Sequence, residues 1–206
     1  MSTSSEGELT FDDLTTVAGL VAGFPAPWYV SGGWAIDLFL GTTTRAHEDL
    51  EIGVARADQA LLHRQLGDRD LRKIVPRGET FDLLPWSEGE WLELPIHQII
   101  VPQAPDHPVE FQFFLNEVWS GEWRFRPDQT IRRPVEECYD VSPFGIPALA
   151  PEIQLLYKCR RHGPKDEHDF RVVLPHLDAS RRAWLSDALR RFRPDDPWLR
   201  ELETSR

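Results

Sequence analysis

Hydrophobic side chains recur at two different spacings along the chain, and the change between them divides it. Up to about residue 148, short apolar segments contain side chains that alternate with polar ones, as in half-buried strands. From Pro151 onward, apolar side chains recur every three or four residues, as on one face of a helix. The pattern therefore predicts an α/β sheet domain over residues 1–148 and a helical region over residues 149–206 packed on it.

The predicted strands are bounded by turn-forming Pro, Gly, Asp and Ser. The clearest is Val109–Leu115, where Glu110 and Gln112 share one face and Phe111 and Phe113 take the other. The remaining predicted strands are Trp28–Val30, Leu50–Val54, Leu71–Val75, Ile96–Val101 and Glu122–Arg126. A first helix is predicted from Thr10 to the prolines at 25 and 27, and another begins at Pro151. Further helices are predicted over Ala35–Leu40, Ala57–Leu66, Lys165–Leu174 and Ala179–Phe192. The last of these is capped by Asp178.

Two adjacent glycines follow the first predicted strand, in the run Ser31-Gly32-Gly33. Glycine lets the backbone approach a ligand closely, and the helix that follows presents free N–H groups to a phosphate. A plain tight turn has the same sequence. The glycines alone therefore leave a phosphate site and a simple turn both open.

Asp49 and Glu51 strengthen the case for a phosphate site. Residues i and i+2 of a strand point to one face, with alpha carbons roughly 6.6 Å apart, so the two carboxylates can converge on a cation. Mg²⁺ is commonly held by one or two carboxylates together with the phosphates of a substrate. The alternative is the solvent-exposed face of an edge strand, where acids are common.

Glu110 supplies a third carboxylate on a separate predicted strand, between apolar neighbours. Burying an unpaired acid there would be costly. A metal ion, a role as general base, or an ion pair with an arginine would each explain it.

Several polar residues near these positions have two interpretations. Arg45 and His47 either contact a triphosphate or order the loop before Asp49. Asp37 is expected to point toward Arg45 or a backbone amide. At the start of a later predicted helix, Lys165, Asp166 and Asp169 are expected to follow the helix dipole, with a phosphate or lysine partner as the alternative.

The chain is acidic, with 23 basic and 34 acidic residues and a net charge of −11. Because nucleic-acid binding relies on neutralising phosphates, this balance argues against a nucleic-acid partner. No segment approaches the roughly 18 apolar residues of a membrane helix, and the N-terminus lacks a secretion signal, so we expect a cytoplasmic protein without a membrane partner. Cys138 and Cys159 lack metal-ligand spacing and are expected to be reduced thiols.

The motifs together resemble a known family. The runs Gly32–Gly41 and Thr44–Glu51 are similar to the signature of small-molecule nucleotidyltransferases of the DNA polymerase beta superfamily. Within it the chain most resembles the aminoglycoside 2''-adenylyltransferase-like branch, with lincosamide nucleotidyltransferases nearby. The resemblance continues through residues 95–98, 110–117, 123–126, 149–158 and 165–170.

The resemblance implies an α+β fold, with a nucleotidyltransferase-type mixed sheet flanked by helices and a C-terminal helical extension. It implies transfer of a nucleoside monophosphate, AMP from ATP, to a hydroxyl of a small molecule such as an aminoglycoside-like antibiotic. Ser31, Gly32 and Gly33 would cradle the triphosphate and Lys158 would face it. The implied catalytic and Mg²⁺-binding carboxylates are Asp49, Glu51 and Glu110, of which Glu110 would be general base or metal ligand.

The commonest superfamily pattern has Asp where this chain has Glu51 and Glu110. This departure motivates an alternative, a nucleotide-binding regulatory protein that kept the fold with weak or no turnover. A second alternative is a toxin-like nucleotidyltransferase acting on tRNA or protein, which the acidic balance disfavours. The expected partners are a nucleotide and a small-molecule acceptor, and the expected assembly is a monomer or a homodimer.

Overall fold

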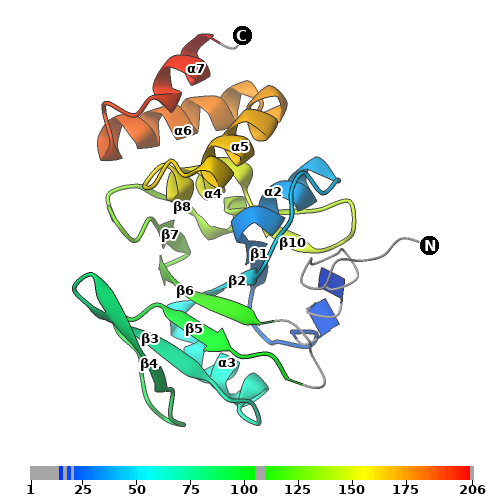
Figure 1. The fold of residues 1–206 in the computed structure, drawn as a ribbon, viewed down its shortest axis with the longest axis vertical. Coiled ribbons are helices and arrows are strands. Elements are labelled where there is room, and N and C mark those ends of the chain that lie inside the picture. Colours follow the sequence, from blue (N-terminus) through cyan, green and yellow to red (C-terminus); the bar gives the residue numbers. More distant parts are fainter. Residues whose placement is uncertain (1–13, 16–17, 20, 105–109, 205–206) are drawn as a thin grey trace. The chain divides into compact units, whose positions relative to one another are not determined.

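The computed structural model describes residues 14–15, 18–19, 21–104 and 110–204 (Figure 1). The chain forms two compact units that interleave in sequence. The first comprises Met1–Ser31 and Arg45–Val118, and the second comprises Gly32–Thr44 and Trp119–Arg206. Each unit contains helices and strands, in agreement with the predicted α/β class. The expected domain boundary between residues 148 and 149 stays a prediction.

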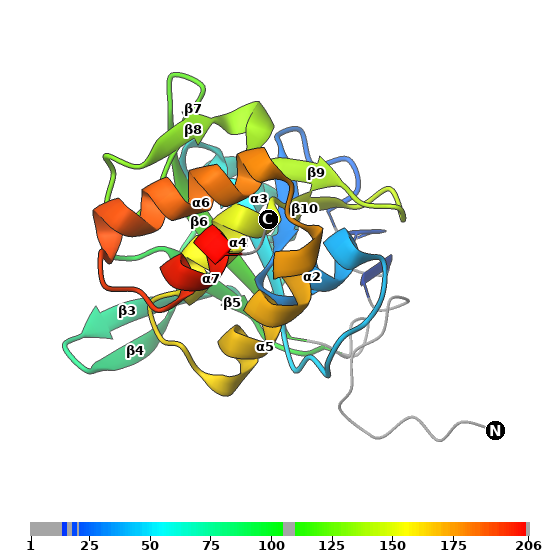
Figure 2. The ribbon, with the colours of Figure 1, turned by 90° about the horizontal axis from the view of Figure 1, so that it is seen from above.

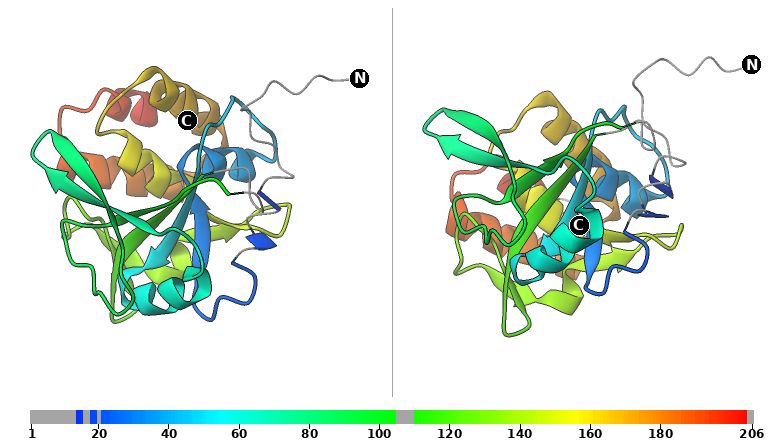
Figure 3. Two further views of the ribbon diagram at one scale, coloured as in Figure 1. Left: turned by 60° about the horizontal axis from the view of Figure 1, so that its bottom comes forward. Right: turned by 90° about the horizontal axis from the view of Figure 1, so that it is seen from below.

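The first unit is built on a mixed sheet with the strand order β4-β3-β5-β6-β2-β1. β2 and β6 run parallel, and the other neighbouring pairs are antiparallel. The strands are β1 (Trp28–Ser31), β2 (Leu50–Ala55), β3 (Arg72–Arg77), β4 (Thr80–Pro85), β5 (Gln98–Val101) and β6 (Phe111–Trp119). A 3-10 helix (Arg56–Asp58) and α3 (Gln59–Leu66) follow β2. Figure 3 shows β3 and β4 as a two-stranded hairpin.

The alternation predicted for β6 is confirmed. Phe111, Phe113 and Leu115 are fully buried, whereas Gln112 and Phe114 on the opposite face are half-buried. The same period places Ile52 of β2 in the core, next to Phe113 in the parallel register. The apolar face of these central strands therefore forms the core of the first unit.

The structure differs from the sequence-based expectation at two strands. β4 was not predicted, and it is exposed along its whole length, with Phe81 60% exposed at the edge of the sheet. An edge strand lacks the burial that produces a readable alternation. β6 begins at Phe111 and runs to Trp119, so Glu110 precedes the strand. The expected helix from Thr10 lies mostly outside the described residues.

The second unit combines helices with short hairpins (Figure 2). Its central helix, α4, packs against α2, α5 and α6, and α7 packs on α6. The helices are α2 (Gly32–Leu40), α4 (Pro151–Lys158), α5 (Pro164–Val173), α6 (Ala179–Phe192) and α7 (Trp198–Thr204). The strands pair as two antiparallel hairpins, β7 (Glu122–Arg124) with β8 (Arg132–Pro134) and β9 (Tyr139–Val141) with β10 (Pro147–Leu149).

The longest helix of the second unit, among the described residues, has the predicted bounds. α6 spans Ala179–Phe192, and the Asp178 carboxylate accepts a hydrogen bond from the Arg181 N–H at 2.9 Å, as an N-cap does. α7 and the strands β8 to β10 were not predicted, because segments of three to seven residues are too short for a readable period.

Cys138 and Cys159 are free thiols in this unit, as expected, and burial raises the pKa of each to about 12. Across the described residues, no helix is both long enough and apolar enough to cross a membrane.

Candidate active site

The first two predicted carboxylates lie at the start of β2, a central strand of the first unit. Asp49 is exposed and directly precedes the strand, and Glu51 is half-buried at its second position. Glu51 belongs to one face of the sheet, and because Asp49 precedes the strand, its expected place on the same face stays a prediction. The interpretation as an edge-strand face is wrong, since β2 lies between β1 and β6.

Two further predicted residues lie on that face because of the strand register. Glu51 is directly opposite Ser31 of β1 on one side and Gln112 of β6 on the other. Residues directly opposite one another point to the same face. Glu110 lies two residues before Gln112, level with Asp49, because Leu50 pairs with Phe111.

Glu110 is exposed, so the expectation of a costly buried acid is wrong. The side-chain amide of Gln112 donates a hydrogen bond to Glu110 Oε1 at 3.3 Å, and Gln98 donates to Gln112 Oε1 at 2.8 Å. The amides and the carboxylate thus form a chain of hydrogen bonds across neighbouring strands. Because Glu110 is exposed to solvent, a ligand can reach its carboxylate.

Ser31 ends β1 and is 8% exposed. Its hydroxyl is buried and has no hydrogen-bond partner within the described residues. An unpaired buried hydroxyl is costly, and such groups occur where a ligand or a water molecule completes the bonding. Ser31 therefore carries an independent sign of a ligand at the end of β1.

Arg45 and His47 contact each other in the loop that precedes Asp49. The Arg45 guanidinium lies 3.2 Å from His47 Nδ1 and donates to the Ala46 carbonyl at 3.1 Å. His47 is buried, at 3% exposure. These contacts give the two side chains a part in ordering the loop, and their contact with a triphosphate stays a prediction.

The carboxylates and amides of this face can bind a metal ion only through their oxygen atoms. Oxygen ligands are the ones that Mg²⁺ prefers. Among the described residues, no group of three or more His, Cys, Asp or Glu side chains is arranged to hold a metal ion. A cation at Asp49 and Glu51 would therefore need further oxygens from a bound phosphate, which is the usual arrangement for Mg²⁺.

The glycines of the predicted turn belong to the second unit and begin α2. Gly32 has a φ of +69°, which only glycine adopts without strain, and its N–H donates to Gln154 Oε1 at 2.8 Å. Gly33 is the second residue of the helix. At the other end of α2, the Asp37 carboxylate accepts from the backbone N–H of Thr44 at 3.1 Å, which confirms its expected contact with a backbone amide.

Lys158 lies at the end of α4 in the second unit. Its ammonium lies 2.8 Å from Asp169 Oδ2 and 3.2 Å from Asp166 Oδ1, both on α5. The lysine partner given as the alternative for these two acids is therefore the one observed. Whether Lys158 also meets a phosphate stays a prediction.

Gln154 was not singled out from the sequence. It lies between Ile153 and Leu155, both fully buried, and is itself only 5% exposed. A long polar side chain inside an apolar helical run was the available signal, because buried polar groups require partners.

The second unit also contains a cavity of about 300 Å³. It is lined by the end of α2, the β9–β10 hairpin and Arg181 of α6. None of the predicted site residues lines it, so the cavity and the glycine turn are separate features.

Comparison with known proteins finds a family model that matches part of the chain. Residues 13–74 match the family model described as aminoglycoside-2''-adenylyltransferase, a segment that includes the glycine turn, Asp49 and Glu51. No match to this chain was found among curated protein sequences.

Solved structures share the fold over nearly the whole chain at low identity. Lincosamide antibiotic adenylyltransferase LnuA, crystallised with lincomycin, is 14% identical over 97% of this chain and 99% of its own, with a TM-score of 0.50. The solution structure of antibiotic-resistance factor ANT(2'')-Ia is 13% identical over 95% and 97%, with a TM-score of 0.57. The crystal structure of ANT(2'')-Ia with adenylyl-2''-tobramycin is 12% identical over 89% and 99%, also with a TM-score of 0.57.

The predicted nucleotidyltransferase-type fold is thereby confirmed. The chain is thus similar to aminoglycoside-2''-adenylyltransferases over residues 13–74, and it shares its fold with the LnuA and ANT(2'')-Ia structures.

Proposed function

We propose that the protein is an antibiotic-modifying nucleotidyltransferase that moves AMP from ATP to a hydroxyl of a small molecule, with an aminoglycoside-like compound as acceptor. The observation that carries this proposal is the position of four residues at three neighbouring strands. Ser31 lies opposite Glu51 in the register of β1 and β2, and Asp49 and Glu110 directly precede the paired residues Leu50 and Phe111 of β2 and β6. The family match includes the first three of these residues. The antibiotics named for the two structural neighbours motivate the choice of acceptor.

In the proposed reaction, the acceptor hydroxyl attacks the α-phosphorus of ATP. Its oxygen forms the new P–O bond, the bond to the β-phosphate oxygen breaks, and pyrophosphate leaves. Glu110 takes the hydroxyl proton, a role for which its exposure on the carboxylate face suits it. Asp49 and Glu51 would hold Mg²⁺, which when bound supplies positive charge to the phosphates. Ser31 Oγ, buried without a protein partner, would donate to a phosphate oxygen.

Within the second unit, two features supply positive charge that suits a phosphate. The N-terminus of α2 carries the partial positive charge of a helix beginning, and Gly32 and Gly33 lie there. Lys158 would share its charge between Asp166, Asp169 and a phosphate. The net charge of −11 favours a polycationic acceptor, because a negative field concentrates cations.

The test is mass spectrometry of tobramycin, lincomycin and a panel of other aminoglycosides after incubation with protein, ATP and Mg²⁺. We expect a gain of one AMP on an acceptor and release of pyrophosphate. Asp49→Asn should reduce the transfer rate by about 100-fold or more, the effect of removing one preorganised electrostatic group. Asp68→Asn is the matched control, because Asp68 is an exposed aspartate of the same unit outside the carboxylate face.

Three results would contradict the proposal. Calorimetric titration that detects no binding of ATP, GTP, CTP or UTP with Mg²⁺ would remove the nucleotide site. Mg²⁺-dependent nucleotide binding without transfer to any acceptor would instead identify a nucleotide-binding protein that lacks turnover. Labelling of tRNA or lysate proteins would identify a macromolecular acceptor in place of an antibiotic.

A further inference from the structure

Gln154 is attached to the first residue of α2 by a long-range contact. Its Oε1 accepts the Gly32 N–H at 2.8 Å, a buried hydrogen bond between residues 122 positions apart in the chain. Gly32 has a left-handed backbone, at φ +69°, so its N–H takes a direction that an ordinary first helical residue would not give it. The contact therefore fixes how the chain turns into α2.

The serine directly before Gly32 also has an unsatisfied side chain. Because Gly32 has a left-handed backbone, Gly32 and not Ser31 takes the capping position of α2. Ser31 Oγ is buried and has no hydrogen-bond partner within the described residues. A buried hydroxyl left unbonded is an independent sign of a ligand at this point of the chain.

Of the two polar atoms in the Gln154 carboxamide, only the oxygen makes a hydrogen bond to the described residues. Oε1 holds Gly32, whereas Nε2 has no hydrogen-bond partner in the part of the chain that the structure describes. Nε2 is attached to the same carbon as Oε1, so its two N–H groups lie beside the start of α2. Gln154 is 5% exposed as a residue, and its Nε2 is not one of the fully buried atoms without a partner, so a ligand that accepts hydrogen bonds can reach this donor.

Lys158 lies four residues after Gln154 on α4, and residues four apart share a helix face. Within the second unit, one face of α4 thus carries an ammonium and an amide, both hydrogen-bond donors. A phosphate group is an acceptor that can use both.

We infer that Gln154 is a nucleotide-binding residue whose carboxamide bridges the backbone of Gly32, through Oε1, and a phosphate oxygen of the nucleoside triphosphate, through Nε2. This inference rests on the proposed function. The bridge places the phosphate at the start of α2 and holds the glycine that shapes that site.

The test compares Gln154→Glu with the wild type in calorimetric titrations of ATP with Mg²⁺ and of adenosine. Glutamate has the same length and still accepts the Gly32 N–H, but it presents a charged oxygen where glutamine presents N–H groups. We expect ATP affinity to fall about 10-fold or more through the lost charge-assisted bond and the new repulsion. Adenosine affinity should stay unchanged. Gln65→Glu, on the exposed surface of α3, is the control for the added charge.

A second variant keeps the test decisive if the glutamate variant fails to fold. Gln154→Met has a similar size and removes the donors without adding charge, and it should also weaken ATP more than adenosine. Wild-type ATP affinity in a folded variant, or equal losses for ATP and adenosine, would overturn the inference while the proposed function stands. A wild-type protein that binds no nucleoside triphosphate would overturn both.

Discussion

Gly53 shows how closely two strands of the first unit approach each other beside the carboxylate face. It lies directly opposite Tyr29 in the antiparallel register of β1 and β2. A Cβ added at Gly53 would lie 2.1 Å from Cε2 of the Tyr29 ring. Glycine is therefore needed here because the ring occupies the space of a side chain, not because of a special backbone angle.

Gly53→Ala should lower the free energy of unfolding by about 1–3 kcal/mol, the usual effect of overpacking a core. Urea unfolding followed by circular dichroism measures it. Gly19→Ala is the control, because no atom of the described residues, apart from its chain neighbours and its own helix backbone, lies within 4 Å of the added Cβ. In a Tyr29→Ala background the same change at Gly53 should cost much less. An equal loss with and without the ring would contradict this account.

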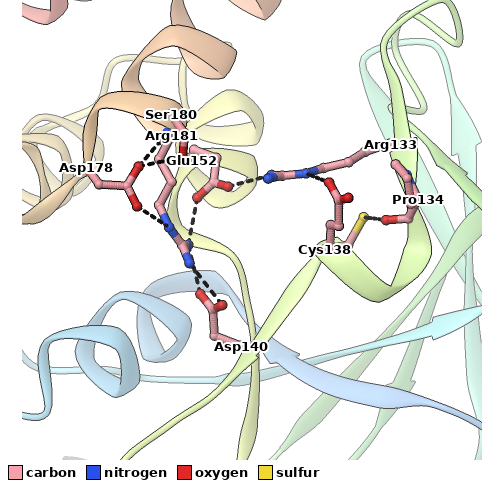
Figure 4. Close-up of polar contacts among 9 residues, drawn as sticks. Arg133, Pro134, Cys138, Asp140, Glu152, Asp178, Ser180 and Arg181 are labelled. Carbon is pink, nitrogen blue, oxygen red and sulfur yellow. Dashed lines mark hydrogen bonds and ion pairs between the residues drawn. The ribbon is translucent and has the colours of Figure 1, made fainter.

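Helix α4 is joined to its neighbours through a buried carboxylate (Figure 4). Glu152, whose side chain is 1% exposed, lies between Arg133 of β8 and Arg181 of α6. Arg181 Nη1 lies 3.0 Å from Glu152 Oε2, and its two terminal nitrogens bond both oxygens of Asp140 on β9 at 2.8 and 3.0 Å. One carboxylate thus links four elements of the second unit.

Glu152→Ala should lower the free energy of unfolding by about 3–5 kcal/mol, because it leaves two arginines partly buried without their shared partner. Thermal or urea unfolding checks the change. Glu137→Ala removes the other acid on Arg133, but this side chain is 56% exposed, so its loss should cost about 0–1 kcal/mol. Similar effects from the two variants would show that burial of Glu152 does not matter.

Long elements with one buried face were easier to predict from the sequence than short or exposed ones. α6 and the alternating face of β6 were predicted correctly, because their periods repeat over enough residues to be read locally. β4 was missed because it is exposed at the edge of the sheet, and α7 because it has only seven residues. Trp198 of α7 is nevertheless fully buried, stacked on Phe170 of α5 with ring centroids 4.3 Å apart.

His162 of the second unit links the stability of the molecule to pH, because its ring contacts two carboxylates. His162 donates from Nδ1 to Glu167 Oε1 and from Nε2 to Asp196 Oδ2, both at 2.8 Å. Donation from both ring nitrogens requires the charged form. Burial lowers the pKa of His162, but the hydrogen bonds to Asp196 and Glu167 outweigh it and raise the pKa above the usual range.

A raised pKa in the folded state gives stability that is complete below the ordinary histidine pKa of about 6.5 and is lost as the pH rises through the folded value. Urea unfolding of the wild type and His162→Asn should therefore differ most at about pH 6 and least at about pH 9. Asparagine suits the position because it tolerates the positive φ of 52° at His162. A difference that grows with pH would contradict the charged pair.

The sequence by itself determined the chemistry of the residues and the face that each presents within its own element. Phe111 and Phe113 share a buried face because a strand has a period of two, and Asp178 caps α6 because its partner N–H is three residues away. These are local relations, fixed by backbone geometry. They explain why the fold could be predicted, whereas the roles of the candidate site residues stay predictions.

Only the tertiary structure decided which faces meet. The alignment of Ser31 with Glu51 and Gln112 depends on strand register, and the pairing of Lys158 with Asp166 and Asp169 depends on how α4 packs against α5. Gln154 reaches Gly32 across 122 residues of sequence. Such contacts result from packing the whole core, where many buried side chains compete for the same space, so no local pattern specifies them.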